Sequence, residues 1–229
     1  MELRLWPSLW HTSTIVFDPT SNKSRQFLQA VTFANSWQLE VSCLYVLQNN
    51  LISTLCVAEE WSHFGVKRKF LRVSAPKGMQ NSSYFLSLPY RYGIPLSICM
   101  GILHWCISQS VFLVQTTAFA ADGTRNYDAD SSRVGFSSIG IMFAIVVGGL
   151  FILGTVSLGF KRLTFHLPIV STNSAAISAA THSPSEDRDA SLLPVKWGVV
   201  ETASHSNSGH CCLTTANDVK PPNTGQTYI

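Results

Sequence analysis

One histidine lies inside a long apolar run, and it is the side chain best placed in this sequence to do chemistry. His104 belongs to the stretch 92–121, which carries no formal charge. An ionisable group at membrane depth is a candidate for a proton or solute path, and Gln109 could share that role. A neutral histidine can equally hydrogen-bond to a neighbouring helix. Because neither this run nor the apolar run that follows holds an acidic residue, packing is the favoured interpretation.

A second group of reactive side chains lies near the C-terminus and consists of His205, His210, Cys211 and Cys212. Adjacent cysteines without a CxxC or HxxxH spacing make a tetrahedral zinc site awkward. As acylation sites these cysteines are about fifty residues from the nearest apolar run, whereas acylated cysteines usually lie beside a membrane anchor. We therefore expect unmodified thiols and neither a metal nor a cofactor. The sequence also lacks a GxSxG element and a positioned base, so we expect no enzymatic activity.

Small residues recur on one face of each of two apolar segments. Four residues of the first segment are spaced by four, three and four positions, which places them on one side of a helix: Ser97, Gly101, His104 and Ser108. The second segment carries a small-xxx-small repeat, which permits close backbone approach: Gly140, Ala144 and Gly148. We expect these two faces to pack against each other.

The elements that would position these residues are membrane spans. No charge occurs between Arg133 and Lys161, and a helix over 136–160 is longer than the roughly 30 Å hydrocarbon core of a bilayer. A second uncharged run predicts a transmembrane helix at about 94–114.

Residues 39–58 form a further apolar segment with three amides near its centre, Gln48, Asn49 and Asn50. Amides in hydrocarbon need partners on neighbouring helices, so this segment is either a third span or an amphipathic helix lying on the bilayer.

Charge sets the expected topology. The basic loop 59–93 contains Lys67, Arg68, Lys69 and Arg72 and is predicted to be cytoplasmic. These bases could bind anionic lipid, although the topological bias alone accounts for them. The acidic loop 115–135 contains no lysine and fits the opposite side. The net charge of +3 is modest, so we expect no nucleic-acid partner.

Both ends of the chain are polar. Residues 1–36 are expected to be irregular, and Asn22 begins a glycosylation sequon that matters only if this end faces the lumen. Residues 161–229 are too poor in apolar side chains to form a core and are predicted to be a mostly disordered cytoplasmic tail. Its apolar stretch 192–200 could dock on a protein partner or on the protein's own cytoplasmic surface.

Several motifs resemble one family. They are LRVSAPKGMQNSSYFLSLPYRYGIPL (71–96), LHW (103–105), SQS (108–110), SAAISAA (174–180), LPVKWGVV (193–200) and GHC (209–211). Over about residues 37–229 the chain resembles the C-terminal part of an uncharacterised family of multi-pass membrane proteins of ascomycete fungi. Longer members carry an N-terminal domain of unknown function, and this chain lacks the family's N-terminal membrane portion, which suggests a truncated paralogue or a misjudged gene start. The resemblance implies that residues 39–58 span the membrane, and it implies no activity.

The sequence thus predicts an all-α membrane protein with transmembrane helices at about 39–58, 94–114 and 136–160, and a disordered C-terminal tail. The expected function is non-enzymatic, through helix packing and interaction of the tail with a cytoplasmic protein, in the plasma membrane or an endomembrane. The alternative is a subunit or fragment of a transporter or channel that uses His104 and Gln109.

Overall fold

The computed structural model describes residues 12–17, 22–163, 173–182, 184, 187–200, 210–223 and 228. The chain divides into two compact units. The first contains Met1–Asn49 and Ile94–Leu158, and the second contains Asn50–Gly93 and Gly159–Ile229. Helix α1 (Lys23–Phe64) contributes residues to both units.

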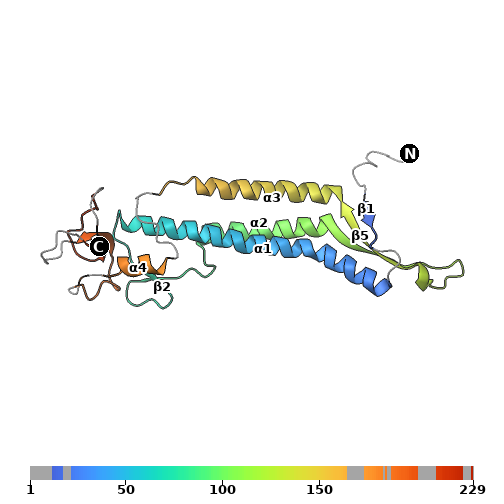
Figure 1. Cartoon of the computed structure of the whole chain (residues 1–229), viewed down its shortest axis with the longest axis horizontal. Coiled ribbons are helices and arrows are strands. Elements are labelled where there is room, and N and C mark those ends of the chain that lie inside the picture. The colour runs from blue at the N-terminus through green and yellow to red at the C-terminus, as the bar shows by residue number, and fades with distance from the viewer. Residues whose placement is uncertain are drawn as a thin grey trace. The chain divides into compact units, whose positions relative to one another are not determined.

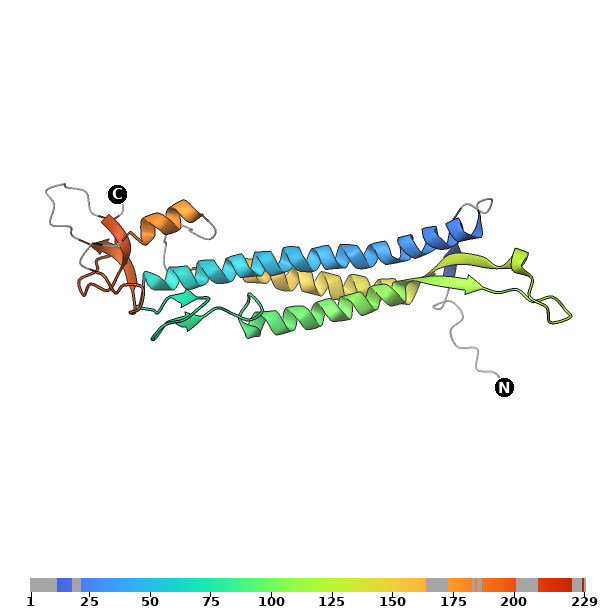
Figure 2. The same ribbon diagram turned by 90° about the horizontal axis from the view of Figure 1, so that it is seen from below.

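The first unit is built on three long helices. Figures 1 and 2 show the N-terminal part of α1 running beside α2 (Tyr90–Ser110) and α3 (Ser138–Gly159). Pro95 is tolerated near the start of α2 because the first turn of a helix does not need its amide proton. On α3 the buried positions are Gly140, Ala144 and Thr155, which lie on one helix face.

A three-stranded antiparallel sheet continues directly from these helices. Its strands are β1 (Thr12–Ile15), β4 (Val111–Thr116) and β5 (Ser131–Ser137), in the order β1-β5-β4. Val111 pairs with Phe136, and Thr12 pairs with Ser137. On α1, Phe33 lies with its ring centroid 6.3 Å from that of Phe136, so aromatic packing joins this helix to the sheet.

The second unit contains the end of α1, the chain segment 65–89 and, from the tail, the described residues 161–163, 173–182, 184, 187–200, 210–223 and 228. Its elements are the parallel pair β2 (Arg72–Val73) and β3 (Asn81–Ser82), helix α4 (Ser174–Ala180), and the antiparallel pair β6 (Lys196–Val200) and β7 (His210–Thr214). A backbone bridge between Lys69 and Val195 links the loop to the tail. The buried core consists of Phe64, Ala180, Val195, Trp197 and Leu213.

The all-α prediction is wrong. Of the described residues 51% are helical and 19% are in strands, with three small sheets, so the fold is mixed α and β. Apolar runs rich in β-branched and aromatic residues pair as strands, which hydrophobicity alone did not distinguish from helix. Residues 111–114 therefore lie in β4 and not in the helix predicted at 94–114.

Two segment boundaries and the tail also differ from the predictions. Residues 23–36 are helical and belong to α1, which continues through 59–64 into the predicted basic loop. The tail contains α4 and the β6–β7 pair, so its described part is folded. Its few apolar residues suffice because they pack against Phe64 and Trp61 of α1 instead of forming a core alone.

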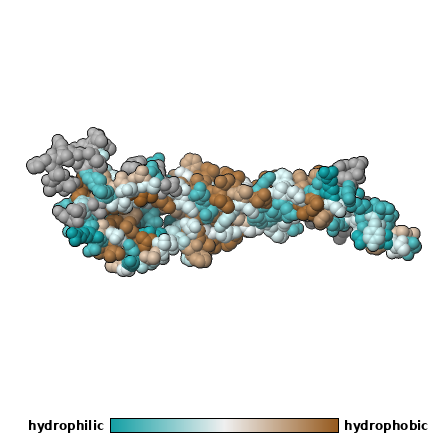
Figure 3. Space-filling model, turned by 60° about the horizontal axis from the view of Figure 1, so that its bottom comes forward, coloured by the Kyte–Doolittle hydropathy of each residue, from teal (hydrophilic) through white to brown (hydrophobic). Residues whose placement is uncertain are grey.

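Within the described residues two helices, α1 and α3, are long and apolar enough to cross a membrane. Helix α2 falls outside this group because the apolar run that begins in it continues as β4. In Figure 3 exposed apolar side chains gather over the helices, whereas the outer end of the β4–β5 hairpin is hydrophilic. On α3 the exposed apolar residues include Met142, Phe143, Ile145 and Leu153.

Candidate functional site

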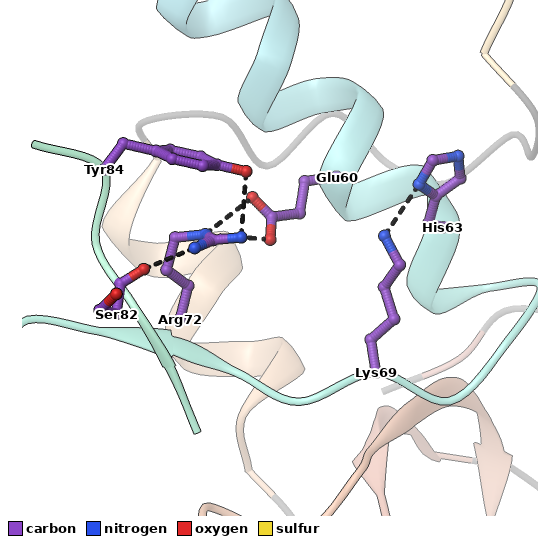
Figure 4. Close-up of polar contacts among 6 residues, drawn as sticks. All are labelled: Glu60, His63, Lys69, Arg72, Ser82 and Tyr84. Carbon is purple, nitrogen blue, oxygen red and sulfur yellow. Dashed lines mark hydrogen bonds and ion pairs between the residues drawn. The ribbon is translucent and has the colours of Figure 1, made fainter. Parts of the chain in front are cut away.

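The largest group of interacting charged side chains in the second unit lies at the end of α1. Figure 4 shows Glu60 and His63 projecting from the helix towards Arg72 and Lys69 of the following loop. The Arg72 Nε lies 3.3 Å from Glu60 Oε1, and another Arg72 nitrogen donates to the Tyr84 hydroxyl at 3.0 Å. The guanidinium also stacks 4.0 Å above the Tyr84 ring and donates to the Ser82 carbonyl. One arginine therefore fixes the loop to the helix.

His63 is held as a hydrogen-bond acceptor. Its Nδ1 lies 2.9 Å from Lys69 Nζ, which can only donate. Burial, and secondly the charge of Lys69, lower the pKa of His63 below its ordinary value. His63 lies outside the predicted span 39–58. Because its pKa is lowered and its Nδ1 accepts from Lys69, the ring is neutral at physiological pH with the proton on Nε2.

Glu59 connects the ends of three helices. Its carboxylate accepts a hydrogen bond from Lys161 Nζ at 2.6 Å and lies 3.8 Å from Arg91. Lys161 follows α3, and Arg91 lies in the first turn of α2. The Lys161 hydrogen bond holds the pKa of Glu59 below its ordinary value, and the same contact raises the pKa of Lys161. Both side chains are therefore charged at neutral pH.

These residues surround a cavity of about 150 Å³ that is lined by Cys56, Glu59, Glu60, His63, Arg72 and Arg91, among others. The charged and polar groups that line it pair with one another, including Lys69 with His63 and Arg72 with Glu60. Within the described part of the chain, no three His, Cys, Asp or Glu side chains lie close enough to hold a metal ion. These contacts hold the loop residues Lys69 and Arg72, and Lys161 after α3, against the end of α1.

Three of the four bases considered for anionic lipid have partners inside the protein. Arg68 donates to the Thr215 carbonyl at 3.0 Å and also to that of Ala216, while Lys69 and Arg72 bind α1. Lys67 is the exposed member of the four. The sequence indicated a basic loop, and docking of the stretch 192–200 on the protein's own surface was one of its two expected roles; the Lys69–Val195 bridge is a contact of that kind.

His104 contacts α1 and not Gln109. Its Nδ1 lies 2.6 Å from Gln38 Oε1, and the Gln38 amide also donates to the His104 carbonyl at 3.3 Å. Gln109 is exposed. Sequence reasoning missed Gln38, because it lies just outside the predicted span 39–58.

The predicted packing residues divide into two groups. Ser97, Gly101 and Ser108 are exposed on α2, whose buried apolar side chains are instead Leu96, Met100, Leu103 and Cys106. On α3 the repeat does face α2. A Cβ on Gly140 would lie 2.8 Å from the Gln109 carbonyl oxygen, and one on Gly148 would lie 3.9 Å from Leu103. Ala144 is buried. Gly140 thus packs against the backbone at the end of α2, and Gly148 lies near the Leu103 side chain.

Asn22, the predicted glycosylation site, stands at the beginning of α1. Its carbonyl accepts from the Arg25 and Gln26 amides, and its side-chain oxygen accepts from the Ser24 amide at 3.3 Å. The residue is exposed. Asn22 therefore caps the helix, and its side chain is on the surface.

In the tail, Asp187 joins the segment that precedes β6 to the end of β7. It accepts hydrogen bonds from the Thr214 and Thr215 hydroxyls at 2.8 and 2.6 Å and from the Thr215 amide at 2.8 Å. Burial acts to raise the pKa of Asp187, but these bonds outweigh it and lower the pKa below its ordinary value.

The predicted reactive group of the tail lies partly in β7. Burial raises the pKa of Cys212 to about 11, so this thiol is protonated at neutral pH. His210 Nε2 lies 2.7 Å from the His182 carbonyl, and His205 falls outside the described residues.

The model of a domain of unknown function, DUF8419, matches residues 12–227. The chain belongs to this family. The match includes residues 12–36, which the motif resemblance left out. No curated protein and no solved structure matches the chain.

Proposed function

We propose that this DUF8419 protein is a multi-pass membrane protein in which α1, α2 and α3 all cross the bilayer. It works without catalysis, by holding the folded second unit on the cytoplasmic side for interaction with a protein partner. The membrane is the plasma membrane or an endomembrane. We also propose that the family is fungal and includes longer members with a further N-terminal domain.

Two sets of backbone pairings support three crossings. β1 and β4 both pair with β5, so these strands must share one side of a membrane. Lys69 pairs with Val195, so the 65–89 loop and the tail must share one side. Each of the three helices connects a segment of the first set to a segment of the second. The helices therefore cross together or not at all, and the apolar character of α3 favours crossing.

The distribution of charge supports the orientation. The loop after α1 is rich in lysine and arginine, and Lys161 and Arg162 follow α3 directly. Cytoplasmic segments carry such an excess. The second unit is accordingly cytoplasmic in our proposal, and the β1-β5-β4 sheet is on the other side.

The form of the second unit supports a role in interaction. Glu59, Glu60 and Asp187 each contact basic or hydroxyl groups, which favours a structural role over proton transfer for these three carboxylates. The stretch 196–200 packs on the protein itself, with Trp197 buried, while the preceding Leu192 and Leu193 remain exposed. We propose these two leucines as the contact for a cytoplasmic partner.

Membrane extraction and protease protection test the proposal. With tags at both ends of the full chain, we expect the protein to remain in membranes washed with alkaline carbonate. Protease added to the cytoplasmic face should remove the C-terminal tag and leave the N-terminal tag. Release of the folded protein by carbonate would overturn the membrane assignment, and protection of the C-terminal tag would overturn the orientation.

A transporter or channel subunit is the second candidate, since His104 is a polar residue in an apolar helix. Its bond to Gln38 favours a packing role. If His104→Leu left the protein stable and correctly located but abolished a measurable proton or solute flux, the transport function would be preferred.

A further inference from the structure

We propose that residues 84–87, here called the aromatic turn, insert into the cytoplasmic surface of the bilayer, with Phe85 as the anchor. This inference rests on the proposed function, because it requires α2 to enter the membrane at its N-terminal end. The partner is the lipid headgroup boundary and not a second protein.

Phe85 is unusual in its exposure. At 88% it is the most exposed large apolar side chain among the described residues. Leaving a phenylalanine ring in water forgoes the stabilisation that burial of its apolar surface would give. A segment that was free to move would turn this ring inward. The outward position of Phe85 therefore requires a turn that is held rigid.

Tyr84 fixes the first side of the turn. Its hydroxyl accepts a hydrogen bond from Arg72 at 3.0 Å, and the Arg72 guanidinium lies 4.0 Å above its ring (Figure 4). Arg72 is itself paired with Glu60 of α1. The backbone entering the turn is thus attached to a helix.

The other side of the turn is fixed against α2. The Ser87 amide donates to the Tyr84 carbonyl at 3.3 Å, and Ser87 adopts a left-handed conformation with φ of 60°. Leu88 is fully buried. A Cβ on Gly93 would lie 3.4 Å from Leu86 Cδ1, so the turn packs against the first turn of the helix. Phe85 is therefore held outward by neighbours that are pinned on both sides.

This packing places Phe85 at the level of the bilayer surface. The 21 residues of α2 extend about 30 Å, which matches the hydrocarbon core, so its first turn lies at the headgroup boundary. Aromatic side chains are enriched at that depth. Tyr90, the first residue of α2, is also exposed. The next residue, Arg91, has a side chain that is 63% exposed, and its positive charge can pair with a lipid phosphate. Continuity with a span and this charge favour lipid as the occupant.

Photocrosslinking in membranes tests the inference. The photoreactive analogue p-benzoylphenylalanine replaces Phe85 in the full chain, and mass spectrometry identifies the adducts after irradiation. Phe143, 57% exposed on α3, is the positive control. Phe119 is 66% exposed and lies beyond β4, which extends about 20 Å from the end of α2, so it is the matched negative control.

We expect lipid adducts at positions 85 and 143 and none at 119. Lipid adducts at 143 without any at 85, or attachment of position 85 to a protein, would overturn the inference and leave the membrane assignment intact. Absence of adducts at 143 would overturn the proposed function and this inference with it.

Discussion

The two units of this protein deal with their apolar side chains in opposite ways. In the first unit α3 exposes Phe143, Ile145 and Leu153, and buries small residues such as Gly140. The second unit buries Val195 and Trp197 in a compact core. A helix that is apolar on nearly all sides is stable when lipid surrounds it, whereas a buried core is the solution for water. In the arrangement that we propose, the first unit would be surrounded by lipid and the second by water.

Their polar groups differ in the same way. The first unit joins α1 to α2 by the hydrogen bond between His104 and Gln38. The second unit relies on ionised carboxylates, including Glu59 and Asp187, each held by several donors. Substitutions should therefore affect one unit and spare the other.

The largest effect is expected from Trp197→Ala. Replacing a buried tryptophan with alanine leaves a cavity and lowers the free energy of unfolding by about 3–5 kcal/mol, which is enough to unfold the second unit. Limited proteolysis should cut the tail of this variant rapidly, while the protein remains in carbonate-washed membranes. Loss of the membrane-bound form would show that the two units do not fold independently.

A pair of glycine variants compares two helix surfaces. Gly140→Leu should destabilise the first unit by about 1–3 kcal/mol, because a Cβ there meets backbone atoms of α2. Gly101→Leu is the matched control, since nothing lies within 4 Å of its Cβ position. Thermal aggregation in detergent measures both. Equal losses in the two variants would contradict the packing described for α3.

Asp187→Asn should cost about 1–2 kcal/mol in the second unit, less than a fully buried charge would, because the group is partly exposed. The pKa of Asp187 is lower in the folded protein than in the unfolded chain. Its contribution is therefore present above about pH 4 and is lost as the pH falls through the lowered pKa. Urea midpoints at pH 7 and pH 3 should differ more in the unsubstituted protein than in the variant. An unchanged pH dependence would contradict the role of Asp187.

The smallest effect is expected from His104→Leu. A hydrogen bond between membrane helices contributes about 0.6 kcal/mol on average, so the variant should fold with slightly reduced stability. Gln38→Leu should have the same effect, and the double variant should lose little more. Additive losses in a double-mutant cycle would show that the two side chains do not act together.

Local sequence pattern predicted one helix well. The uncharged run 136–160 corresponds to α3 at Ser138–Gly159, because charge absence and length are properties of the segment itself. The same reasoning failed for 111–114, where VFLV is also an apolar run but belongs to β4 and pairs with β5. That outcome depends on a strand some twenty residues away.

The candidate site depended even more on distant contacts. The basic loop was visible in the sequence, but the partners of Arg68 lie in the tail, and that of Lys161 lies in α1. The tail has too few apolar residues to predict a core, and it folds because Phe64 of α1 completes that core. Composition cannot reveal a core that is shared between segments so far apart.

Mapping glycosylation in microsomes tests the three crossings most directly. The chain contains sequons at Asn22 and Asn81, and Asp128→Thr would make Asn126 a third one in the β4–β5 connection. We predict glycans on Asn22 and on Asn126 of that variant, and none on Asn81. A glycan on Asn81, or an unmodified Asn126, would contradict the account.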